Sequence, residues 1–199
     1  RDVNIAFANE LSLICHKLGV DVWNLIELAN NHPRVNILQP GPGVGGHCIA
    51  VDPWFIVNSA PDESKLISTA RKINDNKPKH VISQINSVAR SIELTNKEIN
   101  IACLGLSFKA DIDDLRESPA VKIVSSLANF GFNRIYIVEP HISKIPKHLE
   151  ADSVELTSME EGIDKSNIIV ILVDHSEFKS MDRELLIGKK LIDTRGVIR

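Results

Sequence analysis

Apolar residues recur at helical spacing over the first thirty positions, which predicts that this stretch is helical. The apolar positions ahead of the first glycine are Val3, Ile5, Ala6, Ala8, Leu11, Leu13, Ile14 and Leu18. Gly19 punctuates the helix near its end, and Asp21 is suited to cap a second helix that extends to Leu28. Asn9 and Glu10 interrupt the apolar pattern, either as a polar contact inside a helical bundle or as part of a solvated face.

Helical spacing returns between residues 62 and 90, with one expected interruption. Pro78 has no backbone N–H, so we predict an irregularity at residues 74–78. A first helix would end near Ile73, and a second would run on through Val81 and its apolar successors. The first ninety-odd residues are therefore predicted to be helical.

After residue 98 the pattern changes to short apolar runs, which are typical of buried strands. We predict strands at residues 99–104, 135–138, 168–173 and 191–192, with intervening helices that begin at Ser118–Pro119 and near Glu160. This alternation predicts the α/β class, with a parallel sheet and helices on both of its faces. Residues 95–97 are the candidate boundary between a helical domain of residues 1–96 and an α/β domain of residues 97–199.

A glycine-rich loop precedes a single thiol and a carboxylate. Four glycines occur between positions 41 and 46, where they let the backbone approach a ligand closely, and Cys48 and Asp52 follow. A thiol delivered beside an acid indicates a site of covalent catalysis. The alternative is an ordinary loop with a buried, inert cysteine. We expect the apolar residues 54–57 to pack beneath this loop.

A second candidate site follows the first predicted strand, at the edge where parallel sheets bind ligands. Lys109, Arg116 and the helix start at Ser118 supply positive potential that suits a nucleotide diphosphate. The segment lacks the GxGxxG pattern of a dinucleotide fingerprint. The alternative is a surface loop in which Lys109 pairs with Asp111 and Arg116 pairs with Glu117.

Composition narrows the class of protein without naming a function. The chain has 199 residues, 43% of them hydrophobic and 25% charged, as in ordinary globular proteins, and a net charge of −3 that predicts neither a nucleic-acid nor a membrane partner. Three widely spaced cysteines (Cys15, Cys48 and Cys103) fit a reducing cytoplasm, and without CxxC or HExxH we predict no metal site. Arg1 already reads as helix interior, so we expect the chain to begin inside a larger protein.

Together these pieces resemble the UDP-glucose/GDP-mannose dehydrogenase family over nearly the whole chain. The segments that carry the resemblance are 43–48 (GVGGHC) with Asp52, 74–75 (ND), 105–109 (GLSFK), 114–119 (DLRESP), 139–140 (EP) and 193–195 (DTR). The resemblance implies a central helical dimerisation domain followed by a Rossmann-like UDP-binding domain. The family's N-terminal NAD-binding domain would lie upstream of Arg1. A catalytic lysine and asparagine would fall a few residues before Arg1, on the same helix. On this basis the chain alone should be inactive.

The resemblance also implies roles for individual residues. Cys48 would be the nucleophile and Asp52 would act on the hydrolytic water, while we expect His47 to pack against the backbone. The substrate would be bound by Asn36, Gln39, Gly41, Gly45 and Lys109, and by Arg34 reaching the partner subunit's substrate. Arg116 would belong to the segment near the NAD cofactor or the domain interface. Arg195 is a further family position whose pattern varies.

Residues 32–36 (HPRVN), 46–55 (GHCIAVDPWF) and 174–178 (DHSEF) resemble the branch of the family that oxidises UDP-N-acetylmannosamine. This implies NAD-dependent four-electron oxidation of the sugar C6 alcohol to a carboxylate, in a cytoplasmic homodimer that supplies polysaccharide precursors. Three alternatives stay open. They are a UDP-N-acetylglucosamine 6-dehydrogenase, a non-catalytic nucleotide-sugar binding or dimerisation module, and a cysteine hydrolase that uses His47 and Cys48.

Overall fold

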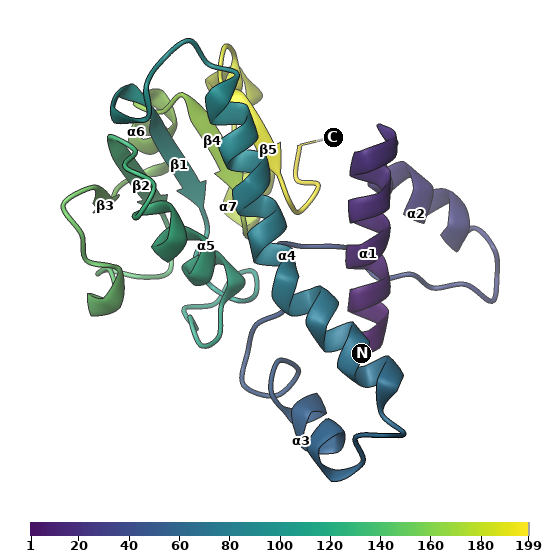
Figure 1. Cartoon of the computed structure of the whole chain (residues 1–199). Helices are drawn as coiled ribbons and strands as arrows, with labels where there is room; N and C mark the ends of the chain where they lie inside the picture. Colours follow the sequence, from purple (N-terminus) through teal and green to yellow (C-terminus); the bar gives the residue numbers. More distant parts are fainter. Residues whose placement is uncertain (199) are drawn as a thin grey trace.

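The N-terminal half of the chain is a set of helices arranged around one long helix (Figure 1). The computed structural model describes residues 1–198. Its first helices are α1 (Asp2–Leu18), α2 (Val22–Asn30), α3 (Asp52–Ser59) and α4 (Lys65–Arg90). α1 lies alongside α4, and α2 lies on the side of α1 away from the sheet. As predicted, Asp21 caps α2, its carboxylate accepting the Asn24 N–H at 2.9 Å.

The C-terminal half is a five-stranded parallel sheet in the order β3-β2-β1-β4-β5. Its strands are β1 (Asn100–Leu104), β2 (Arg134–Val138), β3 (Val154–Leu156), β4 (Ile168–Ile171) and β5 (Lys190–Asp193). The helices are α5 (Pro119–Leu127), α6 (Met159–Asp164) and α7 (Ser176–Lys179), with short 3₁₀ turns η1 (Asn96–Glu98), η2 (Lys147–Leu149) and η3 (Arg183–Leu186). The predicted parallel α/β fold is confirmed. The prediction of four strands missed β3, a three-residue edge strand that is only partly buried.

Helices cover both faces of this sheet, as predicted. Along β1, Ile101 and Cys103 belong to the core under α4 and α5, whereas Ala102 and Leu104 belong to the core under α6 and α7. This alternation is the period of two expected when both faces of a strand are buried. Ser118 begins α5 as predicted, its hydroxyl accepting the Ala120 N–H at 3.2 Å.

The irregularity expected at Pro78 is wrong, because α4 continues through it from Lys65 to Arg90. Proline in a helix interior removes one hydrogen bond and costs about 3 kcal/mol. Tertiary packing offsets this cost, since α4 contacts α1 and α3 and also α5, β4 and β5. Val81, Ile85 and Ala89 of α4 lie in the core of the sheet domain. Because one helix serves both halves, a boundary at residues 96–97 stays a prediction.

Residues 54–57 do not pack beneath the glycine loop. They lie in α3, which has no buried residue, and Phe55 is 65% exposed. Asp52 and Pro53 at the start favour a helix, and its apolar side chains face outward within the described residues. None of the helices in residues 1–198 has both the length and the apolar content needed to cross a membrane.

Candidate active site

Cys48 is the exposed member of the three cysteines, whereas Cys15 and Cys103 are buried. Burial raises the pKa of the Cys103 thiol to about 12, which makes that thiol unreactive. The Cys48 carbonyl accepts hydrogen bonds from the N–H groups of Val51 (3.0 Å) and Asp52 (2.8 Å), forming the turn that leads into α3. The thiol and the Asp52 carboxyl therefore belong to one exposed turn, and the alternative of a buried, inert Cys48 is wrong.

The glycines before Cys48 pack against the protein itself. A Cβ on Gly45 would lie 2.6 Å from the Cβ of Phe108 and 2.9 Å from the carbonyl of Glu117. Gly46 has φ +87°, and its N–H donates to the Arg116 carbonyl at 3.0 Å. The glycine loop can therefore lie directly on the 105–118 loop of the sheet domain only because side chains are missing at these positions.

A buried row of polar side chains between α1 and α4 holds the start of the glycine loop. The Gly41 N–H donates to Asn9 Oδ1 at 2.9 Å, and Asn9 Nδ2 donates to Asn74 Oδ1 at 2.9 Å. Asn74 Nδ2 donates in turn to Asp2 Oδ1 at 2.8 Å. Asn9 is thus a buried polar contact, whereas its neighbour Glu10 is exposed.

Arg71 completes this row and reaches the other end of the loop. Its side chain is fully buried, and Nη1 donates to Asp2 Oδ1 at 2.6 Å and to the Ile49 carbonyl at 3.3 Å. Nη2 pairs with the Asp75 carboxylate. We call Asp2, Asn9, Arg71 and Asn74 the α1–α4 polar row. It ties the backbone on both sides of the Gly43–His47 segment to the same two helices.

Lys109 lies in the loop that follows β1, at the carboxyl edge of the sheet. Its side chain is exposed and, within residues 1–198, has no hydrogen-bond or ion-pair partner. The surface-loop alternative paired Lys109 with Asp111, but the Asp111 carboxylate accepts from the Ser176 N–H (2.8 Å) and hydroxyl (2.7 Å) instead. The backbone after β1 lies close to Arg195, which pairs with Asp174 at 2.6 Å.

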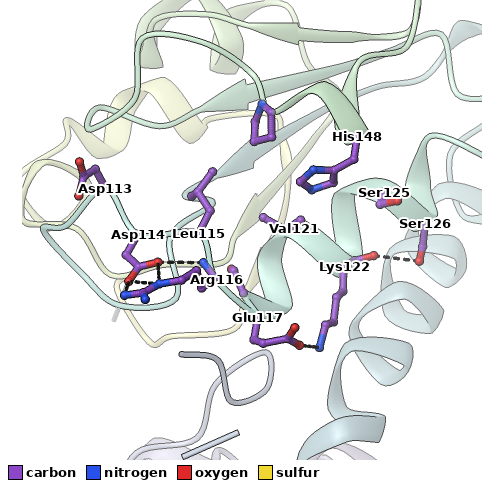
Figure 2. Close-up of a pocket in the computed structure, with 12 residues that line it drawn as sticks. Asp113, Asp114, Leu115, Arg116, Glu117, Val121, Lys122, Ser125, Ser126 and His148 are labelled. Atoms are coloured by element: carbon purple, nitrogen blue, oxygen red, sulfur yellow. Dashed lines mark hydrogen bonds and ion pairs between the residues drawn. The ribbon is translucent and has the colours of Figure 1, made fainter. Parts of the chain in front are cut away.

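Arg116 forms an ion pair with Asp114 rather than with Glu117, so that part of the alternative is also wrong (Figure 2). The pairing lowers the pKa of Asp114 to about 2, chiefly through hydrogen bonds from the Arg116 side chain and backbone. It also raises the pKa of Arg116, to which the nearby Cys48 side chain adds a smaller electrostatic contribution. The exposed Arg116 guanidinium is therefore a cation close to the thiol.

A groove of about 1040 Å³ lies beside Arg116 and not at the thiol. It is lined by residues 113–118, by α5 and by Pro146 and His148 (Figure 2). Cys48, Asp52 and Lys109 do not line it. The structure thus brings the two loops together without enclosing the predicted residues in one cavity.

Comparison with known families identifies the protein family of the chain that carries these two loops. The central-domain model of the UDP-glucose/GDP-mannose dehydrogenase family matches residues 1–76, and its UDP-binding-domain model matches residues 102–199. The chain belongs to this family.

Relatives within the UDP-glucose/GDP-mannose dehydrogenase family carry two substrate names. The NDP-N-acetyl-D-galactosaminuronic acid dehydrogenase of Ralstonia solanacearum is 56% identical, over 99% of this chain and 45% of the relative. The UDP-N-acetyl-D-mannosamine dehydrogenase of Salmonella typhi is 52% identical, over 100% of this chain and 48% of the relative. A solved UDP-D-ManNAc dehydrogenase from Pyrococcus horikoshii is 37% identical with a TM-score of 0.87, covering 100% of this chain and 46% of that one. The chain spans about half the length of these relatives.

The other predicted site residues of this family member are placed as follows. Arg34, Asn36 and Gln39 are exposed in the loop between α2 and the glycine loop. Asn30 holds that loop, because its side chain donates to the Ile37 carbonyl at 3.0 Å and accepts the Ile37 N–H at 2.7 Å. Lys109 lines a small cavity together with Pro42 and Gly43 of the glycine loop, but Arg34, Asn36 and Gln39 do not line that cavity.

His47 is exposed, so the expected packing role is wrong. Its side chain lies near the Asp114 carboxylate and adds a small electrostatic contribution to the lowered pKa of that group. In residues 1–198 neither His47 nor another histidine forms a hydrogen bond with Cys48, and the hydrolase alternative therefore lacks its base.

Sequence reasoning pointed to only two members of the α1–α4 polar row. Asn9 interrupts the apolar pattern and Asn74 belongs to the family resemblance, but Arg71 reads as one more charged residue in a helix with an exposed face. The available signal was positional, because Arg71 and Asn74 are three apart and so share a helix face with Ala70, Val81 and Ile85. Only the packing of α1 on that face shows that these polar groups are buried.

Proposed function

We propose that this chain is the catalytic and UDP-binding part of an NAD-dependent 6-dehydrogenase that oxidises a UDP-N-acetylhexosamine to its uronic acid. Membership of the dehydrogenase family supports the reaction class. The observation that carries the proposal is the exposed Cys48 thiol, held by a glycine loop against the UDP-binding domain and close to Arg116. The complete enzyme requires an NAD-binding domain, so we expect this chain alone to be inactive.

Cys48 supplies the nucleophile that the second step of a four-electron oxidation requires. Loss of the first hydride turns the C6 alcohol into an aldehyde, which cannot lose a second hydride until a nucleophile adds to it. The Cys48 thiolate adds to the aldehyde carbon to form a thiohemiacetal, whose oxidation gives a thioester. Water then cleaves the C–S bond, releasing the carboxylate and regenerating the thiol. Asp52, in the same turn, positions that water or accepts its proton.

The residues of this chain could form only part of an NAD-binding site. The exposed Arg116 guanidinium suits a dinucleotide phosphate, and its place beside the thiol suits a cofactor that reacts at C6. The 105–118 loop lacks a glycine-rich dinucleotide fingerprint, and the GPGVGG run at residues 41–46 does not follow a strand as such a fingerprint would, so other residues of the complete enzyme would supply most of the site. When bound, NAD accepts one hydride in each of the two oxidations.

Substrate binding is assigned to the two loops that meet at Gly46. Lys109 would bind the diphosphate, which is supported by its unpaired and exposed ammonium. Asn36, Gln39, Gly41 and Gly45 would cover the nucleotide sugar through backbone and amide groups. Arg34 would reach the substrate of a second subunit in a homodimer formed by the central helices, in a cytoplasmic enzyme that supplies polysaccharide precursors.

The identity of the sugar is the finer part of the proposal. We propose UDP-N-acetylmannosamine, which one group of relatives names, over the N-acetylgalactosamine derivative that others name. UDP-N-acetylglucosamine, the C2 epimer, is the remaining candidate. Comparing kcat/KM for the three UDP-sugars in the complete enzyme tests this choice, and a tenfold or greater preference for either of the others would contradict it.

The role of the thiol is tested by Cys48→Ala in the complete enzyme, with Cys15→Ala as the matched control. Cys48→Ala should abolish formation of the acid, while UDP-sugar affinity stays within about threefold, because the thiol acts on the aldehyde and not on binding. The unaltered enzyme should yield two NADH for each sugar oxidised. Formation of the sugar acid by Cys48→Ala would contradict the proposal. If the unaltered complete protein bound UDP but oxidised none of the sugars, the non-catalytic module would be favoured.

A further inference from the structure

Two buried side chains lie beneath the loop that carries Lys109. Glu139 follows β2 and His175 follows β4, the strands on either side of β1, and they are 3% and 0% exposed. Because the carboxyl ends of parallel strands meet at one edge, both residues reach under the loop that follows β1. Neither belongs to the thiol site or to the groove beside Arg116.

Glu139 holds the first part of this loop by its backbone. One carboxylate oxygen, Oε2, accepts the N–H of Leu106 at 2.7 Å, the N–H of Ser107 at 3.0 Å and His175 Nε2 at 3.1 Å. The other, Oε1, accepts the His141 N–H at 3.2 Å. Burial favours a raised pKa for Glu139, but the hydrogen bonds from His175, Leu106 and Ser107 outweigh it and hold the pKa below its usual value.

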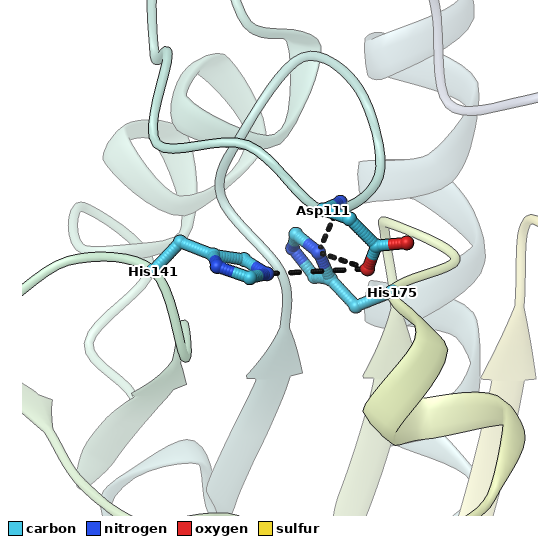
Figure 3. Close-up of side chains that lie close together, drawn as sticks. All are labelled: Asp111, His141 and His175. Carbon is cyan, nitrogen blue, oxygen red and sulfur yellow. Dashed lines mark hydrogen bonds and ion pairs between the residues drawn. The ribbon is translucent and has the colours of Figure 1, made fainter.

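His175 holds the end of the same loop (Figure 3). Its Nδ1 accepts the backbone N–H of Asp111 at 2.9 Å, so the hydrogen-bond pattern places the ring proton on Nε2, which donates to Glu139. Asp111 has φ 59°, a left-handed conformation that is uncommon for residues with a side chain and that this bond helps to fix. Between these anchors, the Ser107 hydroxyl donates to the Lys109 carbonyl at 2.6 Å.

We infer that Glu139 and His175 are positioning residues, which hold the backbone of residues 106–111 so that Lys109 points to the nucleotide sugar. The inference rests on the proposed function for its ligand. The anchors sit before and after Lys109 and leave its ammonium free. Phe108, within the same segment, packs against Gly45 and Gly46, so the pair also sets the surface on which the glycine loop rests.

A metal site is the competing interpretation of this cluster. Ligand atoms of Asp111, His141 and His175 lie within 4.8 Å of one another. However, the nearest His175 nitrogen to Asp111 is Nδ1, which already accepts the Asp111 N–H. A cation there would displace one of the bonds that hold the loop. The hydrogen-bond network therefore accounts for these residues without an ion.

A double-mutant cycle in this 199-residue chain tests the inference, with UDP affinity measured by calorimetry. Lys109→Ala and Glu139→Ala should each weaken UDP binding about tenfold or more, and the double variant should bind no worse than Lys109→Ala, because Glu139 acts through Lys109. If the double variant lost affinity by the product of the two single losses, the inference would be overturned. Unchanged UDP affinity in Lys109→Ala would overturn it as well. Should Glu139→Ala not fold, Glu139→Gln takes its place with a smaller expected loss, about threefold, since its amide oxygen still accepts the Leu106 and Ser107 N–H groups.

Paired histidine variants separate the two anchors by amide hydrogen exchange. His175→Asn retains an acceptor for the Asp111 N–H, whereas His175→Gln retains a donor that reaches Glu139. Exchange should therefore accelerate at Asp111 only in His175→Gln, and at Leu106 and Ser107 chiefly in His175→Asn. His141→Asn is the control, because its backbone N–H, and not its ring, bonds to Glu139. Equal acceleration at all three amides in both histidine variants would contradict the assignment.

The two proposals fail in different ways. If the unaltered chain does not bind UDP, the proposed function fails, while exchange at Leu106, Ser107 and Asp111 still reports whether the pair orders the loop. If UDP binds but the losses of affinity in Lys109→Ala and Glu139→Ala multiply in the double variant, the positioning role fails and the proposed function stands. If Zn²⁺ both slows exchange at Asp111 and tightens UDP binding, the cluster is a metal site and the inference is overturned.

Discussion

The glycine loop and the 105–118 loop meet at Gly46, yet they are anchored in different ways. The glycine loop is tied to the α1–α4 polar row, which joins residues more than sixty positions apart through the packing of two helices. The 105–118 loop is tied to Glu139 and His175, which follow neighbouring strands and reach a common edge because the sheet is parallel. One anchor thus depends on how helices pack, and the other follows from sheet topology.

The two anchors also differ in electrostatic character. The polar row contains a fully buried guanidinium, Arg71, whose charge is compensated by Asp2 and Asp75. The sheet edge contains a buried carboxylate, Glu139, which is stabilised mainly by neutral N–H donors. Removing a charge from the row leaves an unpaired buried ion, whereas removing the carboxylate leaves only neutral groups. Damage to the row should therefore cost more stability.

The largest expected effect is that of Arg71→Met, which breaks the polar row. Asp2 would keep a buried charge without its cation, which typically costs about 3–5 kcal/mol of unfolding free energy. Urea denaturation of the chain measures this loss, and exposed Lys72→Met should change stability by no more than about 0.5 kcal/mol. A loss below about 1 kcal/mol for Arg71→Met would show that the row does not support the helices.

A smaller effect is expected for Gly45→Ala, which tests the contact between the two loops. The new methyl group would lie 2.6 Å from the Phe108 Cβ, so one loop must shift. Overpacking of this kind costs about 1–3 kcal/mol. Gly19→Ala is the control, because it adds strain at φ +68° of about 1 kcal/mol but meets nothing within 4 Å.

Thermal unfolding and exchange at Leu106 distinguish these two glycine variants. Gly45→Ala should lower the melting temperature and also expose the Leu106 amide, because Phe108 lies in the displaced loop. Gly19→Ala should lower the melting temperature slightly and leave that amide protected. Unaltered protection in Gly45→Ala would mean that the loops do not depend on each other.

The smallest effect concerns acid, which should loosen the 105–118 loop. Burial acts to raise the pKa of Glu139 in the folded chain, but hydrogen bonds to its carboxylate outweigh burial, so the pKa is lowered. Its contribution to stability is therefore complete above the unfolded carboxyl pKa of about 4.3 and is lost as the pH falls through the lower folded value. Exchange at Leu106 and Ser107, measured between about pH 5 and 3, should accelerate in the unaltered chain.

Glu139→Gln provides the matched control, since an amide does not titrate. In this variant, amide exchange at Leu106 and Ser107 should change with pH only as the intrinsic chemical exchange rate does. Its free energy of unfolding should decrease less steeply as the pH is lowered. The same acid sensitivity in both proteins would assign the effect to other carboxylates of the loop, such as Asp111 and Asp114, whose pKa values are also lowered by hydrogen bonds.

The sequence by itself determined the class of fold and the family. Alternating apolar runs and helix caps such as Ser118–Pro119 are local signals, and local signals suffice for buried parallel strands. The glycine loop ahead of Cys48 indicated a site of covalent catalysis, and that role of the thiol stays a prediction. The missed strand, β3, is short and half exposed, so it carries little apolar pattern.

Tertiary structure decided what the polar residues do. Pro78 lies within a continuous helix because the packing of α4 against both halves of the chain outweighs a local preference, and α3 exposes an apolar segment that was expected to pack beneath the glycine loop. Likewise, Arg71 and His175 look like surface residues in the sequence, and only the approach of distant segments buries them. Burial and hydrogen bonding depend on those distant neighbours, which no local pattern of the chain contains.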